Sequence, residues 1–313
     1  AMTRRTLLRV ALSTVALVAV ALAVRDLLRQ WDQLTVQPIV WHLRPGALAL
    51  AVIAALGTYL VLIDSWRRVL AGYDHTLPFP VAARVWILSN FGKYLPGKLW
   101  IIAGMAVMAK EVGVRPTAAV TSAVIMQALA LASGAAVGAF APGALAALGP
   151  WGAWGATAVA VASVVGLAFL MSTRARGLLQ SLLPAGAPQL EPVRGSALLI
   201  GLLGNVIAWL GYGLASRWLA AGLFDVPALP VLAASGAFAV SYLAGLLALV
   251  VPGGIGVRET IFIVLLRPYI GLPSAVALAI ASRLLMTLIE LSLALPAALQ
   301  RRRAGDPAPP TTL

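Results

Sequence analysis

Two short segments combine a proline–glycine break with charged side chains inside otherwise apolar sequence. The first reads NFGKYLPGKLW over residues 90–100, and the second reads VPGGIGVRE over residues 251–259. Proline removes a backbone donor and glycine permits unusual dihedral angles, so a half-helix after such a break begins with unpaired N–H groups and a positive dipole end. Such an end attracts anions. The breaks themselves consist of Pro96, Gly97, Pro252, Gly253 and Gly254.

Three cations lie beside these breaks and are candidates for binding a phosphate. Lys93 and Lys98 flank the first break, and Arg258 follows the second. Arginine can bind two oxygens of one phosphate at once, whereas lysine supplies a compact charge. The alternative is that these side chains extend to the membrane interface, and for Lys93 the two interpretations are equally supported. Aromatic residues next to the breaks could pack against a lipid head group or acyl chain: Tyr94, Trp100 and Tyr242.

A second charged group lies in the last apolar segment. Arg283 and Glu290 are seven residues, or two helical turns, apart and therefore share one helix face. A charge in lipid costs at least about 2.5–3.5 kcal/mol, so we expect this face to pair with Glu259 or Arg258. One interpretation is a structural ion pair that joins the last helix to the second break. The other is a polar path or proton carrier that couples substrate movement to a gradient.

The composition excludes a water-soluble globule. Hydrophobic residues make up 61% of the 313-residue chain and charged residues only 11%, and the mean hydropathy is +0.95. We therefore predict an all-α polytopic membrane protein. The absence of cysteine excludes disulfides and thiolate metal sites, and we expect no metal or cofactor. The net charge of +13 is distributed over short loops, which indicates membrane orientation rather than nucleic-acid binding.

Hydrophobic runs of about 20 residues predict six spanning helices. These runs cover residues 6–24, 46–63, 117–140, 151–171, 196–219 and 274–299. The first run also has the features of a signal peptide. The two segments with proline–glycine breaks, 81–109 and 231–270, are predicted to be re-entrant hairpins. The alternative for the second is that it crosses the membrane, because its first arm, residues 231–251, is long enough to do so. Positive charge then predominates on the side of both termini, which is therefore cytoplasmic.

The order helix, helix, broken hairpin, helix occurs twice, with Pro96 and Pro252 lying 156 positions apart. We expect a first repeat over 1–145, an inverted second repeat over 146–300, and a basic, proline-rich cytoplasmic tail over 301–313. Inverted repeats with discontinuous helices are typical of transporters that use alternating access.

With these two motifs, the chain resembles the lysylphosphatidylglycerol synthase transmembrane-region family. This family comprises the flippase-like domain of the bacterial multiple peptide resistance factor and its stand-alone relatives. The resemblance rests on residues 90–100 and 251–259 and extends over nearly the whole chain. It implies a bacterial cytoplasmic-membrane protein that moves aminoacylated phospholipids or polyprenyl-phosphate-linked lipids between leaflets.

We therefore expect a lipid flippase and not an enzyme, because the sequence carries none of the common catalytic motifs. Membrane lipids with anionic head groups are the expected partners, and the chain could form a homo-oligomer or associate with a lipid-synthesis enzyme. The alternatives are an integral membrane lipid-modifying enzyme and a non-catalytic subunit of a glycosyltransferase.

Overall fold

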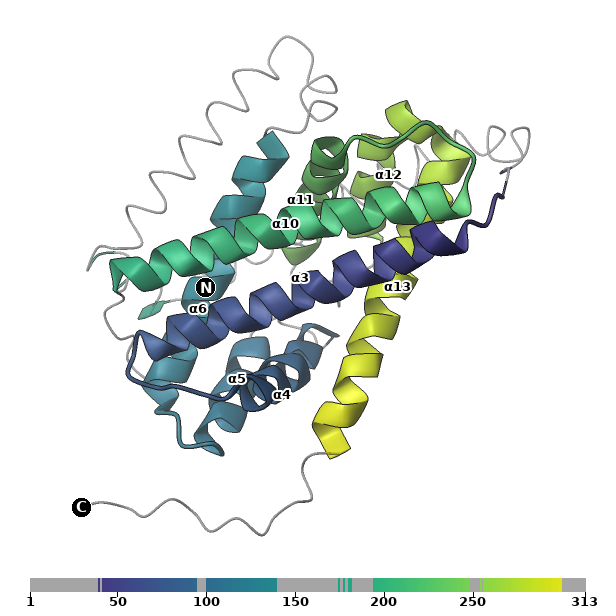
Figure 1. Ribbon diagram of the computed structural model, residues 1–313. Coiled ribbons are helices and arrows are strands. Elements are labelled where there is room, and N and C mark those ends of the chain that lie inside the picture. Colours follow the sequence, from purple (N-terminus) through teal and green to yellow (C-terminus); the bar gives the residue numbers. More distant parts are fainter. Residues whose placement is uncertain are drawn as a thin grey trace, which may run out of the picture.

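The computed structural model describes residues 41–94, 100–139, 194–247 and 256–299, with the single positions 39, 174, 177, 180, 181 and 254. This part of the chain is helical and contains no strand; an isolated bridge joins Trp41 to Phe224. Figure 1 shows the helices packed into one bundle. The predicted all-α membrane class is confirmed at this level.

Four of the described helices are long and apolar enough to cross a bilayer. They are α3 (Pro45–Ala71), α6 (Pro116–Ala139), α10 (Gly195–Leu223) and α13 (Leu272–Leu299). Even the shortest, with 24 residues, extends beyond the roughly 30 Å of a hydrocarbon core at about 1.5 Å per residue. The predicted runs 46–63, 117–140, 196–219 and 274–299 are thereby confirmed. The runs 6–24 and 151–171 lie outside the described residues.

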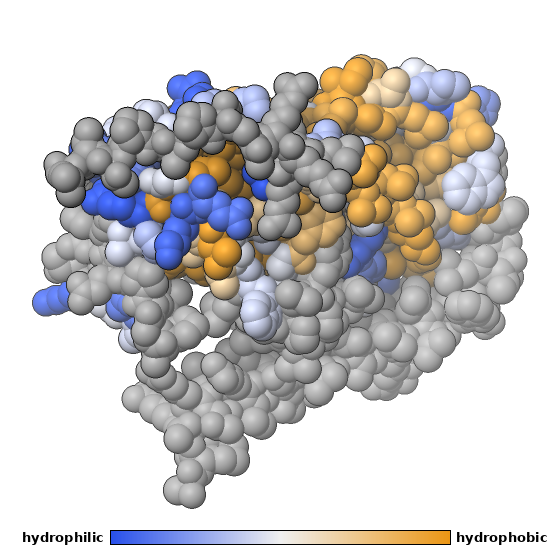
Figure 2. Space-filling view, turned by 90° about the horizontal axis from the view of Figure 1, so that it is seen from below, coloured by the Kyte–Doolittle hydropathy of each residue, from blue (hydrophilic) through white to orange (hydrophobic). Residues whose placement is uncertain are grey.

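Large apolar side chains follow the outer faces of these helices. On α13 the exposed residues recur every three or four positions: Ile280, Leu284, Leu288, Leu291 and Leu295. This is the spacing of one face of a helix, and the exposure of such an apolar face to water is unfavourable. Figure 2 shows hydrophobic residues forming a continuous surface over one part of the molecule. Contact with lipid accounts for this surface.

Two pairs of shorter helices correspond to the segments with proline–glycine breaks. The first pair consists of α4 (Phe79–Asn90) and α5 (Trp100–Lys110), with the 3₁₀ turn η1 (Phe91–Tyr94) after α4. The second consists of α11 (Val231–Leu247) and α12 (Val257–Ile270). Within each pair the two helices pack against each other. The break residues Pro96, Gly97, Pro252 and Gly253, and the tail 301–313, lie outside the described residues.

The most extensive helix–helix contact among the described elements is between α3 and α10, which are antiparallel (Figure 1). At one end, Arg44 before α3 forms a 2.9 Å ion pair with Asp225 after α10. At the other end, Gly72 after α3 lies against Ala197 near the start of α10. The pair is therefore aligned over its whole length.

Glycines on α10 allow this close approach. A Cβ at Gly204 would lie 1.8 Å from Ser65 Oγ, and a Cβ at Gly211 would lie 2.2 Å from Thr58 Oγ1. At Gly204 the added Cβ would also lie 2.6 Å from Ser65 Cβ, so a side chain there would force α3 and α10 apart, whereas at Gly211 the Thr58 hydroxyl would have to rotate away. Small residues at a helix interface are a common way to pack helices in membranes, where lipid is as apolar as the side chains.

The other helices surround this central pair. Helix α6 packs on α10 and α11, and α13 packs on α3 and α4. Helix α5 packs on α6, and α12 packs on α13. The buried apolar residues form two clusters, one around α4, α5 and α6 and the other around α11, α12 and α13. Both clusters include residues of α3 and α10, so the central pair joins them.

Candidate functional site

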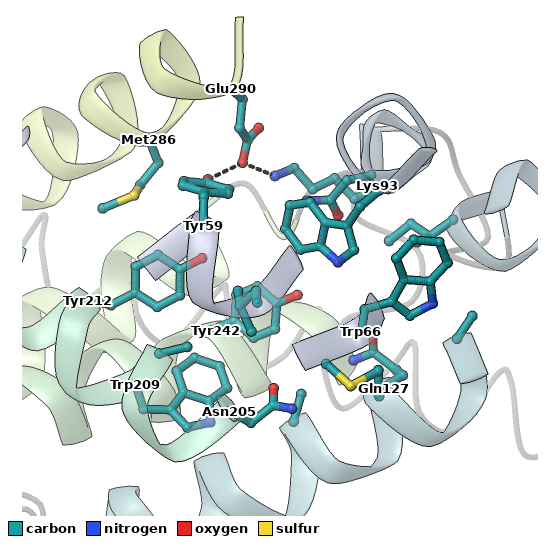
Figure 3. Close-up of a pocket in the computed structure, with 18 of the residues that line it drawn as sticks. Tyr59, Trp66, Lys93, Gln127, Asn205, Trp209, Tyr212, Tyr242, Met286 and Glu290 are labelled. Carbon is teal, nitrogen blue, oxygen red and sulfur yellow. Dashed lines mark hydrogen bonds and ion pairs between the residues drawn. The ribbon is translucent and has the colours of Figure 1, made fainter. Parts of the chain in front are cut away.

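The helix pairs α4–α5 and α11–α12 are called the first and second hairpin below. A cavity of about 130 Å³ lies in the middle of the bundle, between these two hairpins and the four long helices (Figure 3). We call it the aromatic cavity. A second cavity of about 70 Å³, the charged cavity, adjoins it. The two share Lys93, Ile101, Tyr242, Arg258, Met286 and Glu290 in their walls. The shared wall contains residues from both hairpins and from α13.

Glu290 on α13 joins three segments of the chain at this shared wall. Its Oε1 accepts a 2.5 Å hydrogen bond from the Tyr59 hydroxyl on α3. The same oxygen forms an ion pair with the Lys93 ammonium on η1. Glu290 is only 7% exposed, and Figure 3 shows both partners converging on its carboxylate. A buried carboxylate needs such partners because burial penalises an uncompensated charge.

Glu259 has two structural tasks at the start of α12. Its Oε2 accepts a 2.6 Å hydrogen bond from the Gly256 N–H, which caps the helix. Its Oε1 forms a 2.7 Å ion pair with Arg283 on α13. The expected pairing of Arg283 with Glu259 is therefore present. Glu290 lies on the same face of α13 as Arg283, as the seven-residue spacing predicts, and both line the charged cavity.

Arg258 lies next to Glu259 but is not paired with it. Among the residues that the structure describes, its guanidinium has no hydrogen bond and no ion pair, although it lines both cavities. It lies instead over the ring of Phe238, 4.6 Å from the centroid. Phe238 in turn stacks on Tyr212 at 4.4 Å. The flat guanidinium is held by a cation–π contact, which leaves its N–H donors available to a ligand.

Glycine geometry positions the segment that carries Arg258. Gly256 has φ of +85° and Gly254 has φ of +65°, both in the region that favours glycine. A Cβ at Gly254 would lie 2.7 Å from the Gly245 Cα on α11. The predicted break at Gly254 is thus a tight turn, and it brings the start of α12 against α11.

The aromatic cavity takes its name from rings on four helices, α3, α4, α10 and α11. Tyr59 makes edge contacts with Trp86 at 5.9 Å and with Tyr212 at 6.2 Å. Trp209 contacts Tyr212 at 6.1 Å and Tyr242 at 5.4 Å. Edge contacts of this kind are the preferred arrangement of aromatic pairs. These contacts fix the orientation of each ring relative to its neighbours.

Two amide side chains also line this cavity, Gln127 on α6 and Asn205 on α10. Asn205 donates a 2.8 Å hydrogen bond to the Gly201 carbonyl of its own helix. Gln127 Nε2 is buried and has no hydrogen-bond partner among the described residues. An unpaired buried donor costs free energy unless a ligand or water satisfies it.

The structure brings together five of the residues singled out from the sequence: Lys93, Tyr242, Arg258, Arg283 and Glu290. Glu259 contacts this group through Arg283. Trp100 begins α5 with its side chain 53% exposed. The side chain of Tyr94 and the whole of Lys98 lie outside the described residues, so their predicted roles stay untested.

Sequence reasoning missed several wall residues, namely Tyr59, Trp66, Trp86, Trp209 and Tyr212. For Tyr59, Trp209 and Tyr212 the available signal was a polar-tipped aromatic inside a spanning run, away from the membrane interfaces where such residues are common. Trp66 and Trp86 lie outside the predicted spanning runs. Over the described ranges, no three histidine, aspartate or glutamate side chains gather as a metal site would require.

These features define a multi-pass, all-helical membrane protein with a polar cavity inside the bundle. The chain matches the family model described as the lysylphosphatidylglycerol synthase TM region over residues 6–293, and it belongs to this family. The suspected resemblance is confirmed, and the family indicates a lipid-related function. No curated protein matches the chain.

Proposed function

We propose that this protein is a flippase that moves a lipid with an anionic head group between the two leaflets. The unpaired Arg258 at the wall of both cavities is the observation that carries the proposal. A guanidinium cannot lose its charge in a protein, and an uncompensated charge inside a membrane bundle is costly. A phosphate in the cavity would supply the missing counter-charge through two hydrogen bonds.

The charges at the site support a monoanionic ligand. Three cations, Lys93, Arg258 and Arg283, face the charged cavity. Two of them already have carboxylate partners, because Lys93 pairs with Glu290 and Arg283 pairs with Glu259. One positive charge is left over, which a phosphodiester would neutralise.

The helix contacts support the predicted inverted repeat. When α3 is exchanged with α10, α4 with α11, α5 with α12 and α6 with α13, each described contact between helices becomes another described contact. Thus α6 on α10 corresponds to α13 on α3, and α6 on α11 corresponds to α13 on α4. The central α3–α10 pair maps onto itself, as a pair at a two-fold axis must.

Two hydrogen bonds are also related by this exchange. Tyr59 lies 14 residues after the start of α3, and Trp209 lies 14 residues after the start of α10. Glu290 follows Pro273 by 17 residues, and Ser133 follows Pro116 by 17. Tyr59 donates to Glu290 at 2.5 Å, and Trp209 Nε1 donates to Ser133 Oγ at 3.0 Å. Each aromatic donor thus crosses from one repeat to the last helix of the other.

In this proposal both helical hairpins enter the membrane and return on the side from which they came. One of the two hairpins opens toward each leaflet. The head group passes from one hairpin to the other while the acyl chains stay in lipid. Both termini face the cytoplasm of a bacterial cell. The protein translocates its cargo without chemically changing it.

Reconstitution into proteoliposomes tests the proposal directly. A fluorescent anionic phospholipid is incorporated, and its arrival in the outer leaflet is measured by dithionite reduction of the fluorophore. The Arg258→Gln variant should lose most of the translocation rate, whereas Arg267→Gln should keep it. Arg267 is a matched control because it lies on the same helix, α12, but does not line either cavity.

Equal translocation by the wild type and Arg258→Gln would remove Arg258 from the site. Translocation no faster than in protein-free vesicles, tested with several anionic lipids, would contradict the flippase assignment itself. Size-exclusion chromatography of each variant separates a loss of function from a loss of folding.

A further inference from the structure

The charged side chains occupy only one end of the aromatic cavity. Lys93, Arg258 and Glu290 all belong to the wall shared with the charged cavity. Every other residue that lines the aromatic cavity is uncharged. In Figure 3, Glu290 and Lys93 lie on one side of the view, and Gln127, Asn205 and Trp209 lie on the other. A head group in this space would have its phosphate at one end and the rest of its polar atoms at the uncharged end.

The uncharged end has fixed ring faces. The indole N–H of Trp66 donates to Ser122 Oγ at 3.0 Å, and that of Trp209 donates to Ser133 Oγ at 3.0 Å. These bonds hold the rings in place. Trp66 is fully buried and Trp209 is 4% exposed, so these bonds use the polar atoms of both rings and leave the wall there apolar.

Neutral amides accompany these rings. The unpartnered Gln127 Nε2 is a buried donor at the wall, and Asn205 contributes a second amide. A sugar or cyclic polyol has an apolar C–H face that stacks on a ring and a rim of hydroxyls that bond amides. This combination of rings and neutral amides matches such a ligand, because both of its surfaces are satisfied.

The same wall is unsuited to a cationic head group. The carboxylate within it is Glu290, which already accepts from Tyr59 and pairs with Lys93. An ammonium group would find no free carboxylate among the described wall residues, and it would meet the excess positive charge of Arg258. At low effective dielectric, this repulsion acts across the whole small cavity.

From this distribution we infer that the cargo carries an uncharged sugar or polyol joined through a single phosphate. Aminoacylated lipids are disfavoured. The inference rests on the proposed function and names the substrate class of the same site. In the bound state the phosphate contacts Arg258, the polyol packs against the apolar wall at Trp209, and Gln127 donates to one of its hydroxyls.

Binding measured by native mass spectrometry tests the preference independently of transport. The purified full chain is mixed with equal amounts of phosphatidylinositol, phosphatidylglycerol and lysylphosphatidylglycerol with identical acyl chains. The expected result is at least about tenfold more bound phosphatidylinositol than lysylphosphatidylglycerol, with phosphatidylglycerol between them. Equal or greater occupancy by lysylphosphatidylglycerol overturns the inference and leaves the flippase proposal intact.

Two substitutions at one position sharpen the test. Gln127→Leu should reduce phosphatidylinositol binding several-fold without increasing lysylphosphatidylglycerol binding, because it removes a donor only. Gln127→Glu supplies the missing carboxylate and should raise lysylphosphatidylglycerol binding relative to phosphatidylinositol. If neither variant changes the ratio between these lipids, Gln127 does not face the head group and the inference fails.

A soluble competitor distinguishes a lipid from a free phosphate ester. Glycerophosphoinositol, which has the same head group without acyl chains, should displace phosphatidylinositol only at a concentration at least about a hundredfold higher. Displacement at equal concentration would contradict the lipid assignment of the proposed function and retain the polyol preference. The flippase proposal and the polyol preference would therefore be contradicted by different results.

Discussion

The Tyr59 hydroxyl donates a 2.5 Å hydrogen bond to Glu290, 231 positions further along the chain. The bond joins the middle of α3 to the middle of α13, and Lys93 approaches the same carboxylate oxygen from η1. A single buried acceptor thus holds two long helices and the first hairpin together. Any movement of the hairpin against α13 must break or exchange the Lys93 contact.

Tyr59→Phe should lower the thermal stability of the detergent-solubilised protein. A hydrogen bond to a charged group contributes about 1.5–3 kcal/mol, and the phenyl ring keeps the contacts with Trp86 and Tyr212. Ser133→Ala removes the corresponding neutral bond and leaves the buried Trp209 N–H unpaired, so it should cost about 1–3 kcal/mol. Thermal unfolding followed by intrinsic fluorescence measures both variants, and an unchanged unfolding midpoint for either would contradict the contribution of that bond.

Glu290→Gln should destabilise the protein more strongly, since it leaves Lys93 without its carboxylate. Breaking a buried ion pair by removing one partner costs about 3–5 kcal/mol, whereas replacing both partners by apolar groups is often nearly neutral. The double variant Lys93→Met, Glu290→Leu should therefore recover most of the stability and still fail to move lipid. A double variant that transports at the wild-type rate would show that the pair is only structural.

The hydrophobic runs predicted four long helices correctly because a spanning helix needs little more than length and apolar composition. The spacing of Arg283 and Glu290 also predicted a shared face. The cost of an isolated charge predicted pairing of this face with Glu259 or Arg258, and Arg283 pairs with Glu259. These inferences depend on local periodicity and on the cost of isolated charges, and both can be assessed from a single sequence.

The partner of Glu290 was not predictable in the same way. Lys93 lies on a 3₁₀ turn nearly 200 residues earlier, and no local rule relates the two positions. The aromatic wall was missed for the same reason, since tyrosine and tryptophan in a span are individually uninformative. Only the packing of α3 against α10 brings Tyr59 and Tyr212 to one cavity.

Glu259 carries two contacts that substitution can separate. Glu259→Gln keeps an oxygen that accepts from the Gly256 N–H but loses the charge that pairs with Arg283. Glu259→Ala loses both contacts and should cost about 0.5–2 kcal/mol more, the usual value of a helix cap. The difference in unfolding midpoint between the two variants measures the cap. Equal midpoints would show that the cap contributes nothing to stability.

Two glycines should respond in opposite directions to alanine. A Cβ at Gly213 on α10 would lie 2.5 Å from the Ser235 backbone nitrogen on α11, so Gly213→Ala should cost about 1–3 kcal/mol through overpacking. Gly57 on α3 has nothing within 4 Å of its Cβ position. Gly57→Ala should be neutral or stabilise by up to about 1 kcal/mol, because alanine favours the helix. Thermal unfolding tests both, and destabilisation by Gly57→Ala would contradict the described packing.

Disulfides engineered into this cysteine-free chain should distinguish movement between the repeats from movement within a hairpin. The Cβ position of Gly138 on α6 lies 3.9 Å from Val240 Cβ on α11, and that of Gly104 on α5 lies 3.6 Å from Ser89 Cβ on α4. Both distances suit a disulfide, for which about 3.5–4.5 Å is usual.

Gly138→Cys with Val240→Cys joins α6 to α11, which belong to different proposed repeats, so oxidation should arrest lipid translocation and reduction should restore it. Ser89→Cys with Gly104→Cys joins two helices of one hairpin and should leave the rate unchanged, because the hairpin moves as a unit in an alternating-access cycle. Full translocation with the α6–α11 disulfide formed would rule out relative movement of these helices. Arrest by the α4–α5 disulfide alone would instead assign the movement to the interior of the first hairpin.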